Sequence, residues 1–329
     1  MNLKAQPIKA LVTAAGQGQR LRPLTNDKPK PMLEFFGAPL LAHILWRLKA
    51  EIPARSLRSL GMTSFDIAVN TNYCADEIVK FHKNSPIPFY LSNEPTLMGS
   101  GGAVDHLRDS GWLKPNDHLL VHNGDIISDI DIAELMRVHF ASKNRATVSV
   151  IARQPEYGPV LVKDNKLVSI GKTGDHTIAL GYILSPEFIK SIPKGITNII
   201  DTFNKFLYSE GSSIGAVLHT GVWFEIGSPK LYAKAQLEAV KSQTLFKKLK
   251  VAEILKFYGI SYEYSENFFS VNKKHNVKLD CQGPVVINGK FESKESTIQL
   301  SHAVIMPFAC ISSDRVNRQV CYADGCIDI

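Results

Sequence analysis

Apolar runs and amphipathic stretches alternate along residues 8–240 of this 329-residue chain. Short apolar runs bounded by turn residues predict strands at 8–13, 65–70, 87–91, 118–122 and 146–151. Between them, amphipathic stretches predict helices at 39–50, 75–83, 101–110 and 131–142. Such alternation is typical of α/β proteins, so we predict an α/β, Rossmann-like fold with a mostly parallel sheet.

The pattern changes after residue 151. A hairpin is predicted at 160–170, turning at Asp164-Asn165, and a further strand from Ile178 to Leu184. Residues 241–276 have apolar positions at near-helical spacing, which predicts a helical linker. We therefore expect a main domain at 1–240, the linker at 241–276 and a C-terminal extension at 277–329.

The extension has a six-residue period. Ile305 and Ile311 form one row, and a second row contains Ile298, Val304, Cys310, Val316 and Tyr322. This period is typical of a left-handed parallel β-helix, here two to three coils long. Irregular β hairpins with a chance period are the alternative.

A glycine-rich, proline-rich and cationic loop, Gly16 to Pro31, follows the first predicted strand. Gly16 and Gly18 allow a tight turn and close approach of a ligand. Backbone N–H groups and cationic side chains together suit a polyphosphate. Arg20 and Lys30 are presented on a backbone stiffened by prolines. A basic surface loop without a ligand is the alternative; Leu21 stands where a dinucleotide-binding motif needs glycine, and no P-loop motif is present.

The loop resembles the signature G-x-G-x-R-L-x-P-L-T-x-x-x-P-K-P of the sugar-phosphate nucleotidyltransferases, whose fold is of the GT-A-like type. All ten fixed positions of that signature match. The resemblance implies transfer of a nucleotidyl group from a nucleoside triphosphate to a sugar 1-phosphate, with release of pyrophosphate. It also implies that Arg20 binds the leaving pyrophosphate, that Lys30 binds the α-phosphate, and that Ala14, Gly16 and Gly18 contact the nucleotide.

Two carboxylates are candidate ligands for Mg²⁺. Asp125 ends the run His122-Asn123-Gly124-Asp125. Taken alone, an aspartate at a strand end is more often a cap or turn residue, but the run resembles the family's metal-binding aspartate. Glu225 stands where the family's W-x-D-x-G motif has aspartate, so its carboxylate extends one methylene further. Mg²⁺ prefers one or two carboxylates plus substrate phosphates, which this pair would supply.

Other segments resemble the family's base and sugar sites. The glycine-rich run Glu94 to Ala103 implies that Gly99 and Gly101, together with Asn123, contact the nucleotide; a helix start that needs close packing is the alternative. The resemblance assigns sugar-phosphate contacts to three further residues, which are Gly181, Lys172 and Asp201. For Asp201, a first-turn helix residue is an equal alternative. The turn that begins at Asn70 resembles a supporting motif of the family.

Composition restricts the setting of this chemistry. The net charge of +7 comes from scattered basic residues rather than stripes interleaved with aromatic ones, so we expect small anionic substrates and no nucleic acid. No apolar run of membrane-spanning length and no signal-peptide core is found, so we expect no membrane partner. Five cysteines without a C-x-x-C motif favour reduced thiols and a cytoplasmic location, and leave a zinc site in the extension as an alternative.

The predicted activity is that of an Mg²⁺-dependent nucleotidyltransferase acting on a sugar 1-phosphate. Within the family, the resemblance is strongest to mannose-1-phosphate guanylyltransferases, which use GTP and carry a β-helix tail used in oligomer contacts; we therefore expect a homo-oligomer through the extension. A uridylyltransferase acting on a hexose or amino-sugar 1-phosphate is one alternative. The other is a non-catalytic paralogue that binds a nucleotide sugar, favoured by Glu225. The segment 51–62 predicts a surface insertion without an assigned role.

Overall fold

The computed structural model describes residues 7–50, 66–208, 214–271 and 275–329. The chain forms two compact units that are interleaved in sequence. Unit 1 consists of Met1–Gly16, Leu45–Ile126 and Ile130–Trp223, and unit 2 of Gln17–Ile44, Ile127–Asp129 and Phe224–Ile329. The predicted insertion at 51–62 lies outside the described residues, and the domain boundaries at 240 and 276 stay a prediction.

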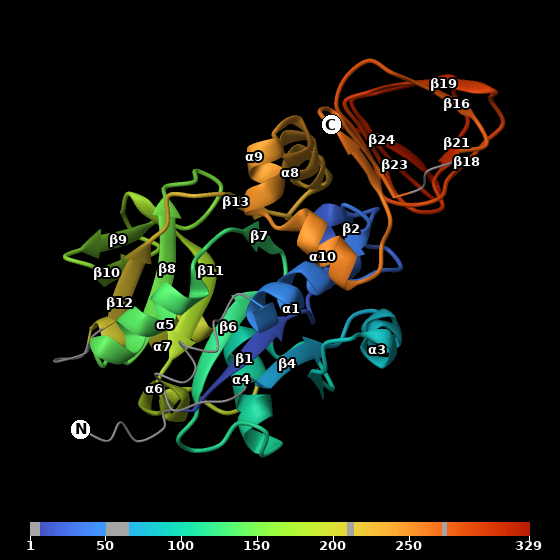
Figure 1. Ribbon diagram of the computed structural model, residues 1–329. Helices are drawn as coiled ribbons and strands as arrows, with labels where there is room; N and C mark the ends of the chain where they lie inside the picture. Colours follow the sequence, from blue (N-terminus) through green and yellow to red (C-terminus); the bar gives the residue numbers. More distant parts are fainter. Residues whose placement is uncertain (1–6, 51–65, 209–213, 272–274) are drawn as a thin grey trace. The chain divides into compact units, whose positions relative to one another are not determined.

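Unit 1 is built on a nine-stranded sheet in the order β5-β4-β1-β6-β11-β8-β12-β10-β9 (Figure 1). Its strands are β1 (Ile8–Thr13), β4 (Asp66–Thr71), β5 (Tyr90–Asn93), β6 (His118–Asn123), β8 (Ala146–Ala152), β9 (Val160–Lys163), β10 (Lys166–Ile170), β11 (His176–Leu184) and β12 (Ile214–Leu218). Its helices are α3 (Ala75–Asn84), α4 (Gly99–Asp109), α5 (Ile132–Ala141), α6 (Pro186–Ser191) and α7 (Ile199–Leu207), and α1 (Leu40–Ala50) begins in unit 2 and ends in unit 1. Each strand and helix predicted in this region overlaps an observed one, which confirms the predicted alternation of strands and helices.

The sheet is mixed, which corrects the prediction of a mostly parallel one. Strands β5, β4, β1 and β6 are parallel neighbours, as are β8 and β12. Strand β11 is antiparallel to both β6 and β8, and the hairpin β9–β10 adds antiparallel pairs at the edge. Strand β11 follows that hairpin directly, without the crossover helix that a parallel strand requires.

Helices pack on both faces of the sheet. One face forms a cluster with α4, α6 and α7 that includes Leu107, Phe188 and Phe203 as well as Val148 of β8. Thr147 precedes Val148, so its side chain points to the other face, where it contacts His139 of α5. The sheet is therefore covered on both faces, and its strand edges are the places left for ligands.

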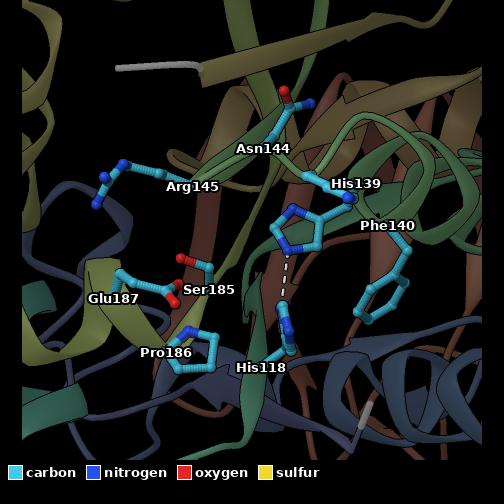
Figure 2. Close-up of a pocket in the computed structure, with 9 residues that line it drawn as sticks. His118, His139, Phe140, Asn144, Arg145, Ser185, Pro186 and Glu187 are labelled. Atoms are coloured by element: carbon cyan, nitrogen blue, oxygen red, sulfur yellow. Dashed lines mark hydrogen bonds between the residues drawn. The ribbon is translucent and has the colours of Figure 1, made fainter. Parts of the chain in front are cut away.

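Three histidines of unit 1 lie in or beside this sheet: His122 and His139 are buried, and His118 is half-buried. His118 Nδ1 lies 2.9 Å from His139 Nε2 (Figure 2). His139 Nδ1 lies 2.9 Å from Thr147 Oγ1. His122 Nδ1 donates to the carbonyl oxygen of Asn123 at 2.7 Å. Burial lowers the pKa of His118 and of His122 to about 4, and that of His139 to about 3. All three imidazoles are therefore neutral in the folded protein at pH 7.

This neutrality predicts loss of stability in mild acid. The unfolded chain binds protons on these imidazoles below about pH 6.5, whereas the folded chain does not until about pH 4, so stability is lost as pH falls through this window. The free energy of unfolding should fall by about 3–4 kcal/mol per pH unit around pH 5. Urea unfolding at a series of pH values measures this slope.

The His139→Gln variant should lower the slope by roughly a third, because one of the three imidazoles no longer takes up a proton. His106→Gln is the control, because His106 is a half-buried histidine of α4 outside this group of three; its replacement should leave the slope unchanged. An unchanged slope in the His139→Gln variant would contradict the conclusion that the His139 imidazole is neutral in the folded protein.

Unit 2 contains the cationic loop, a helical segment and the C-terminal sheets. Its elements up to residue 270 are η1 (Gln19–Leu21), η2 (Lys30–Met32), β2 (Glu34–Phe35), β3 (Ala38–Pro39), α8 (Pro229–Lys241), α9 (Gln243–Lys248), α10 (Val251–Phe257), β14 (Glu263–Ser265) and β15 (Phe268–Ser270). Strand β13 (Trp223–Glu225) pairs with β7 (Ile126–Ser128). The predicted linker is thus helical as far as Phe257 and then forms strands.

The extension is strand-rich and its strands form parallel sheets. Successive strands are β16 (Lys278–Cys281), β17 (Val285–Ile287), β18 (Glu292–Ser293), β19 (Thr297–Ser301), β20 (Ala303–Ile305), β21 (Cys310–Ile311), β22 (Arg315–Asn317) and β23 (Gln319–Tyr322). Strands pair in parallel with the third strand along, as in β16–β19, β17–β20 and β18–β21. Successive strands therefore belong to different sheets, and the chain passes to the next sheet about every six residues. Ile305 and Ile311 face the core, whereas Cys310 is exposed.

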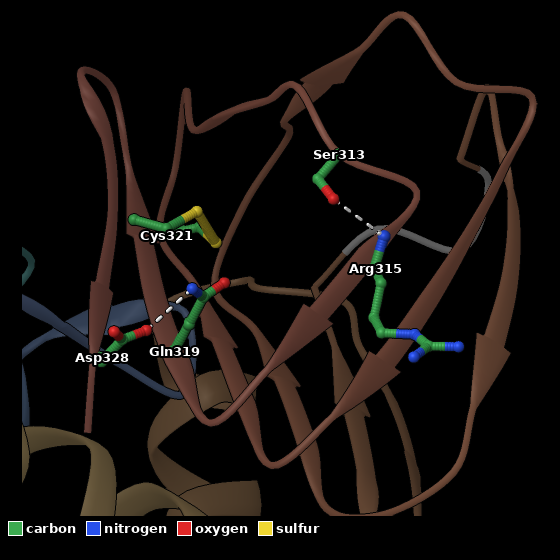
Figure 3. The surroundings of a disulfide bond; sticks show 6 residues. Ser313, Arg315, Gln319, Cys321 and Asp328 are labelled. Carbon is green, nitrogen blue, oxygen red and sulfur yellow. Dashed lines mark hydrogen bonds between the residues drawn. A yellow bond between two sulfur atoms is a disulfide. The ribbon is translucent and has the colours of Figure 1, made fainter.

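A disulfide joins Cys321 of β23 to Cys326 of β24 (Gly325–Asp328) (Figure 3). The two residues lie directly opposite in an antiparallel pair, with their Cα atoms 4.1 Å apart. The prediction of reduced thiols is wrong for this pair, because the hairpin brings the two sulfurs together and sequence spacing did not show it. Cys74, Cys281 and Cys310 are free. Among the described residues, no cluster of three or more metal-ligating side chains supports the zinc alternative, and every described helix is too short or too polar to cross a bilayer.

Candidate functional site

The carboxyl ends of β5, β4, β1 and β6 meet at one edge of the sheet in unit 1. Thr13 is in register with Asn123, and Val12 with Val69. Ala14, the Asn70 turn and the segment from Asn123 to Asp125 are therefore neighbours. This edge is where α/β proteins bind nucleotides.

A buried hydrogen-bond network joins three loops at this edge. Ala14 N–H donates to Asn70 Oδ1 at 2.6 Å, and Asn70 Nδ2 donates to Glu94 Oε1 at 2.7 Å. Glu94 Oε2 accepts from Met98 N–H at 3.1 Å, at the start of the glycine-rich loop. Asn70 and Glu94 are 4% exposed, so the network is shielded from water. The Asn70 turn supports the site as predicted, whereas Glu94 was not singled out, since its partners are distant in sequence.

Replacing Asn70 by alanine should remove both side-chain bonds and leave buried groups of Ala14 and Glu94 short of partners. Each such group costs about 1–3 kcal/mol, so we expect a loss of about 2–4 kcal/mol in the free energy of unfolding. Urea unfolding measures it. Asn72→Ala is the matched control: Asn72 Nδ2 donates to the Glu94 backbone oxygen at 3.0 Å but is only half-buried. Equal losses in the two variants would argue against the network.

The glycine-rich loop is packed against the segment before α7. The Thr197 carbonyl oxygen accepts from Gly101 N–H at 3.0 Å and from Gly102 N–H at 3.3 Å. A Cβ on Gly99 would lie 2.6 Å from this oxygen, and Gly99 has φ +76°. Close packing at the start of α4, the alternative to nucleotide contact, thus accounts for these glycines. The N–H groups of Gly101 and Gly102 are already used within the protein.

The same packing brings Asp201 near the glycine-rich loop. Ser100 Oγ accepts from Ile199 N–H at 3.0 Å, and Asn198 caps α7 through its side chain. Asp201 lies in the first turn of α7 and is exposed. It therefore has the position expected of a first-turn acid and remains accessible to a ligand.

Gly181 and Lys172, the other two predicted sugar-phosphate contacts, have surroundings different from those of Asp201. A Cβ on Gly181 would lie 2.0 Å from the Val121 carbonyl oxygen of the adjacent strand, so close strand packing requires this glycine. Lys172 Nζ lies 5.2 Å from the ring centre of Tyr208, the residue after α7. Asp201 is seven residues earlier, about 10 Å along the helix axis. The structure does not bring Lys172 and Asp201 together.

Asn123 ends strand β6, and Asp125 follows in the turn after it, at the same edge as Ala14. Gly124 N–H donates to Thr13 Oγ1 at 3.4 Å, which connects the turn after β6 to the end of β1. Both Asn123 and Asp125 are half-buried. The Asp125 carboxylate is thus held on a short turn between β6 and β7.

In unit 2, the loop after β1 closes in a tight turn and directs Arg20 to Glu225. Gly18 has φ +61°, and its carbonyl oxygen accepts from Leu21 N–H at 2.8 Å and from Thr25 Oγ1 at 2.9 Å. Arg20 Nη2 lies 3.2 Å from Glu225 Oε1; the Arg20 side chain is 66% exposed and that of Glu225 only 7%. Two residues with separately predicted roles are therefore one ion pair.

Gly227 makes room for the Glu225 carboxylate. A Cβ at position 227 would lie 2.2 Å from Glu225 Oε2 and 2.3 Å from Oε1. The side chain of Glu225 therefore folds back over its own chain, which accommodates the extra methylene relative to aspartate.

Lys30 begins the short helix η2 and is half-buried. Lys28, two residues earlier, has a different environment. Lys28 Nζ pairs with Glu34 Oε1 at 2.8 Å. The following Phe35 and Phe36 are fully buried, and Phe36 N–H donates to Gln236 Oε1 of α8 at 3.2 Å. The segment after Lys30 is thus anchored in the core of unit 2.

The candidate metal ligands fit Mg²⁺ by donor type. Asp125 of unit 1 and Glu225 of unit 2 each carry a carboxylate, the donor that Mg²⁺ combines with water and substrate phosphates, and their use as one site stays a prediction. Within the described residues, no protein-only cluster of three or more ligands is present. The Glu225 carboxylate is engaged by Arg20, so a metal would compete with that guanidinium or share the carboxylate with it.

Comparison with known proteins identifies relatives of the chain. The nucleotidyl transferase family matches residues 9–242. The chain is similar to mannose-1-phosphate guanylyltransferase 1 of Arabidopsis thaliana, 28% identical over 68% of this chain and 63% of the relative. It is 30% identical to mannose-1-phosphate guanyltransferase of Emericella nidulans over 68% of this chain and 62% of that protein. The alignments thus span less than two thirds of these relatives.

The fold is similar to that of solved structures. UDP-glucose pyrophosphorylase from Acinetobacter baumanii matches with a TM-score of 0.56 and 18% identity, over 76% of this chain and 99% of the other. At this identity the match concerns the fold only.

Proposed function

The chain belongs to the nucleotidyl transferase family, and from this premise we propose that it transfers a nucleotidyl group from a nucleoside triphosphate to a sugar 1-phosphate. The family match over residues 9–242, which includes the complete signature loop, carries the proposal. The relatives named above favour GTP and mannose 1-phosphate. We keep a cytoplasmic location and a homo-oligomer through a short C-terminal β-helix as predictions, supported for the β-helix by the three sets of parallel strands.

In the proposed reaction, an oxygen of the sugar phosphate forms a bond to the α-phosphorus of the nucleotide. The bond from that phosphorus to the bridging oxygen breaks, and its electron pair leaves with pyrophosphate. Such a transfer needs positioning and charge neutralisation more than a protein nucleophile. Mg²⁺, when bound through Asp125 and Glu225, would neutralise phosphate charge.

The chain's own residues would hold the reactants. The Lys30 ammonium would contact the α-phosphate, and the exposed Arg20 guanidinium would take up charge on the pyrophosphate. The Asn70–Glu94 network would keep the ends of β1 and the glycine-rich loop in place around the nucleotide. Asp201, at the start of α7, would accept hydrogen bonds from sugar hydroxyls.

A pyrophosphate-release assay with four nucleoside triphosphates and a set of sugar 1-phosphates tests this proposal and assigns base and sugar together. Turnover is expected with at least one pair, GTP and mannose 1-phosphate being the first choice. Turnover only with UTP and a hexose or amino-sugar 1-phosphate would replace that choice by the uridylyltransferase alternative.

One observation favours a second function. Glu225 is held by Arg20 and is longer than the family's aspartate, so the chain could instead be a non-catalytic paralogue that binds a nucleotide sugar and regulates a partner enzyme. Tight binding of a nucleotide sugar, without turnover of any substrate pair, would favour that reading over the enzyme.

A further inference from the structure

A cavity of about 360 Å³ lies in unit 1 at the sheet edge opposite to the candidate site (Figure 2). Its lining includes His118, the first residue of β6, whereas the candidate site begins at Asn123, the last. Five residues of a strand span about 17 Å. The volume lies within the range of about 300–1,000 Å³ that small-molecule sites occupy.

Two cations lie on the rim of this cavity. Lys143 and Arg145 precede strand β8, line the cavity and are exposed. The Arg145 guanidinium lies over the ring of Phe206 at 5.6 Å, which restricts its position. Among the described residues, neither cation forms a salt bridge. They are therefore available to an anionic group such as a phosphate.

The rest of the lining is suited to hydroxyl groups. The Glu187 carboxylate lies on the same side of the cavity as Arg145 (Figure 2). A hydrogen bond from its own backbone N–H, and a further one from Ser185, lower its pKa, and its remaining lone pairs can accept from a hydroxyl group. The imidazoles of His118 and His139 are joined to each other, and His139 is oriented by Thr147. Both ring nitrogens of His139 are used in these contacts, so Nε2 of His118 is the imidazole nitrogen left to exchange a hydrogen bond with a ligand. Because both imidazoles are neutral at pH 7, the pair adds no charge to the cavity.

We propose that this cavity binds a small phosphorylated polyol. The phosphate contacts Lys143 and Arg145. The hydroxyl groups contact Glu187 and Nε2 of His118, whose ring is held by His139. Such a ligand binds alongside the substrates of the opposite sheet edge instead of competing with them, and the proposal does not depend on the proposed function.

The test uses the full chain with ¹³C-labelled histidine and two probes, inorganic phosphate and a hexose 6-phosphate. The hexose 6-phosphate should bind saturably, shift the His118 and His139 resonances and bind at least about tenfold more tightly than phosphate, because only it engages the hydroxyl-binding groups. Its affinity should be the same in the Lys30→Ala variant, which separates this cavity from the candidate site.

Variants then test the two halves of the lining. Arg145→Gln and Lys143→Gln should each weaken both probes about tenfold, the loss expected for one charged contact. Glu187→Gln should weaken only the hexose 6-phosphate. Lys190→Gln is the matched control, since Lys190 is exposed on the same helix as Glu187 but does not line the cavity.

These side chains are exposed, so the variants are expected to fold, and their thermal unfolding is checked. No saturable shift of the two imidazole resonances with either probe would overturn the proposal. Equal affinity for phosphate and the hexose 6-phosphate, or binding unaffected by both cation variants, would also overturn it.

Discussion

Replacing Lys30 by alanine should lower the rate of pyrophosphate release by roughly 10²- to 10⁴-fold, because one preorganised positive charge at the reacting phosphate is lost. The effect should lie mainly in kcat, since charge on the α-phosphate grows in the transition state. Steady-state kinetics with saturating substrates measures it. The fold should be kept, because the neighbouring Phe35 and Phe36 anchor this segment in the core.

Lys28→Ala is the matched control for this variant. Lys28 is in the same loop and carries the same charge, but its ammonium is paired with Glu34 at 2.8 Å. Its replacement should change the rate by less than about threefold, because this charge is already neutralised by Glu34 within the protein. A Lys30→Ala protein with undiminished pyrophosphate release would overturn the proposed role of Lys30.

Replacing Glu225 by glutamine should lower kcat by about 10²-fold or more and raise the Mg²⁺ concentration needed for half-maximal rate, because a ligand charge is lost while the shape is kept. Glu225→Asp, which has the family's residue, should retain activity. Rates measured over a series of Mg²⁺ concentrations give both quantities.

The ion pair with Arg20 provides the decisive comparison. If Glu225 served only to hold Arg20, the Arg20→Gln and Glu225→Gln variants would have the same defect, the double variant would be no worse, and the Mg²⁺ requirement would be unchanged. That combination would refute a metal-binding role for Glu225. An increased Mg²⁺ requirement in the Glu225 variant alone would support it.

The two predictions separate the candidate functions. A catalyst needs both Lys30 and Glu225, whereas a regulatory protein needs only nucleotide-sugar binding. Loss of turnover with preserved nucleotide affinity in these variants fits the enzyme. The cavity at the opposite sheet edge is tested by binding alone, so its fate does not depend on either outcome.

Sequence pattern was sufficient for the local elements. Strand β1, the helices α3 to α5 and the hairpin at Asp164-Asn165 follow from apolar period and turn chemistry, which act over a few residues. The prediction of a mostly parallel sheet was wrong at β11 and at the β9–β10 hairpin, since strand orientation depends on the connection and on neighbours far away in sequence. The disulfide was missed for the same reason: Cys321 and Cys326 become partners only when the hairpin pairs them.

For the candidate site, the sequence by itself determined the chemistry of the loop from Gly16 to Pro31 and, through its signature, the family. That information is local, because a tight turn and preorganised cations are properties of consecutive residues. Only the tertiary structure decided that Arg20 is paired with Glu225, that Glu94 supports Ala14 through Asn70, and that the glycines at 99 and 101 accommodate Thr197. These contacts join residues that are 24 to 205 positions apart in the sequence. Packing of the core brings such residues together, and a short sequence motif contains no information about it.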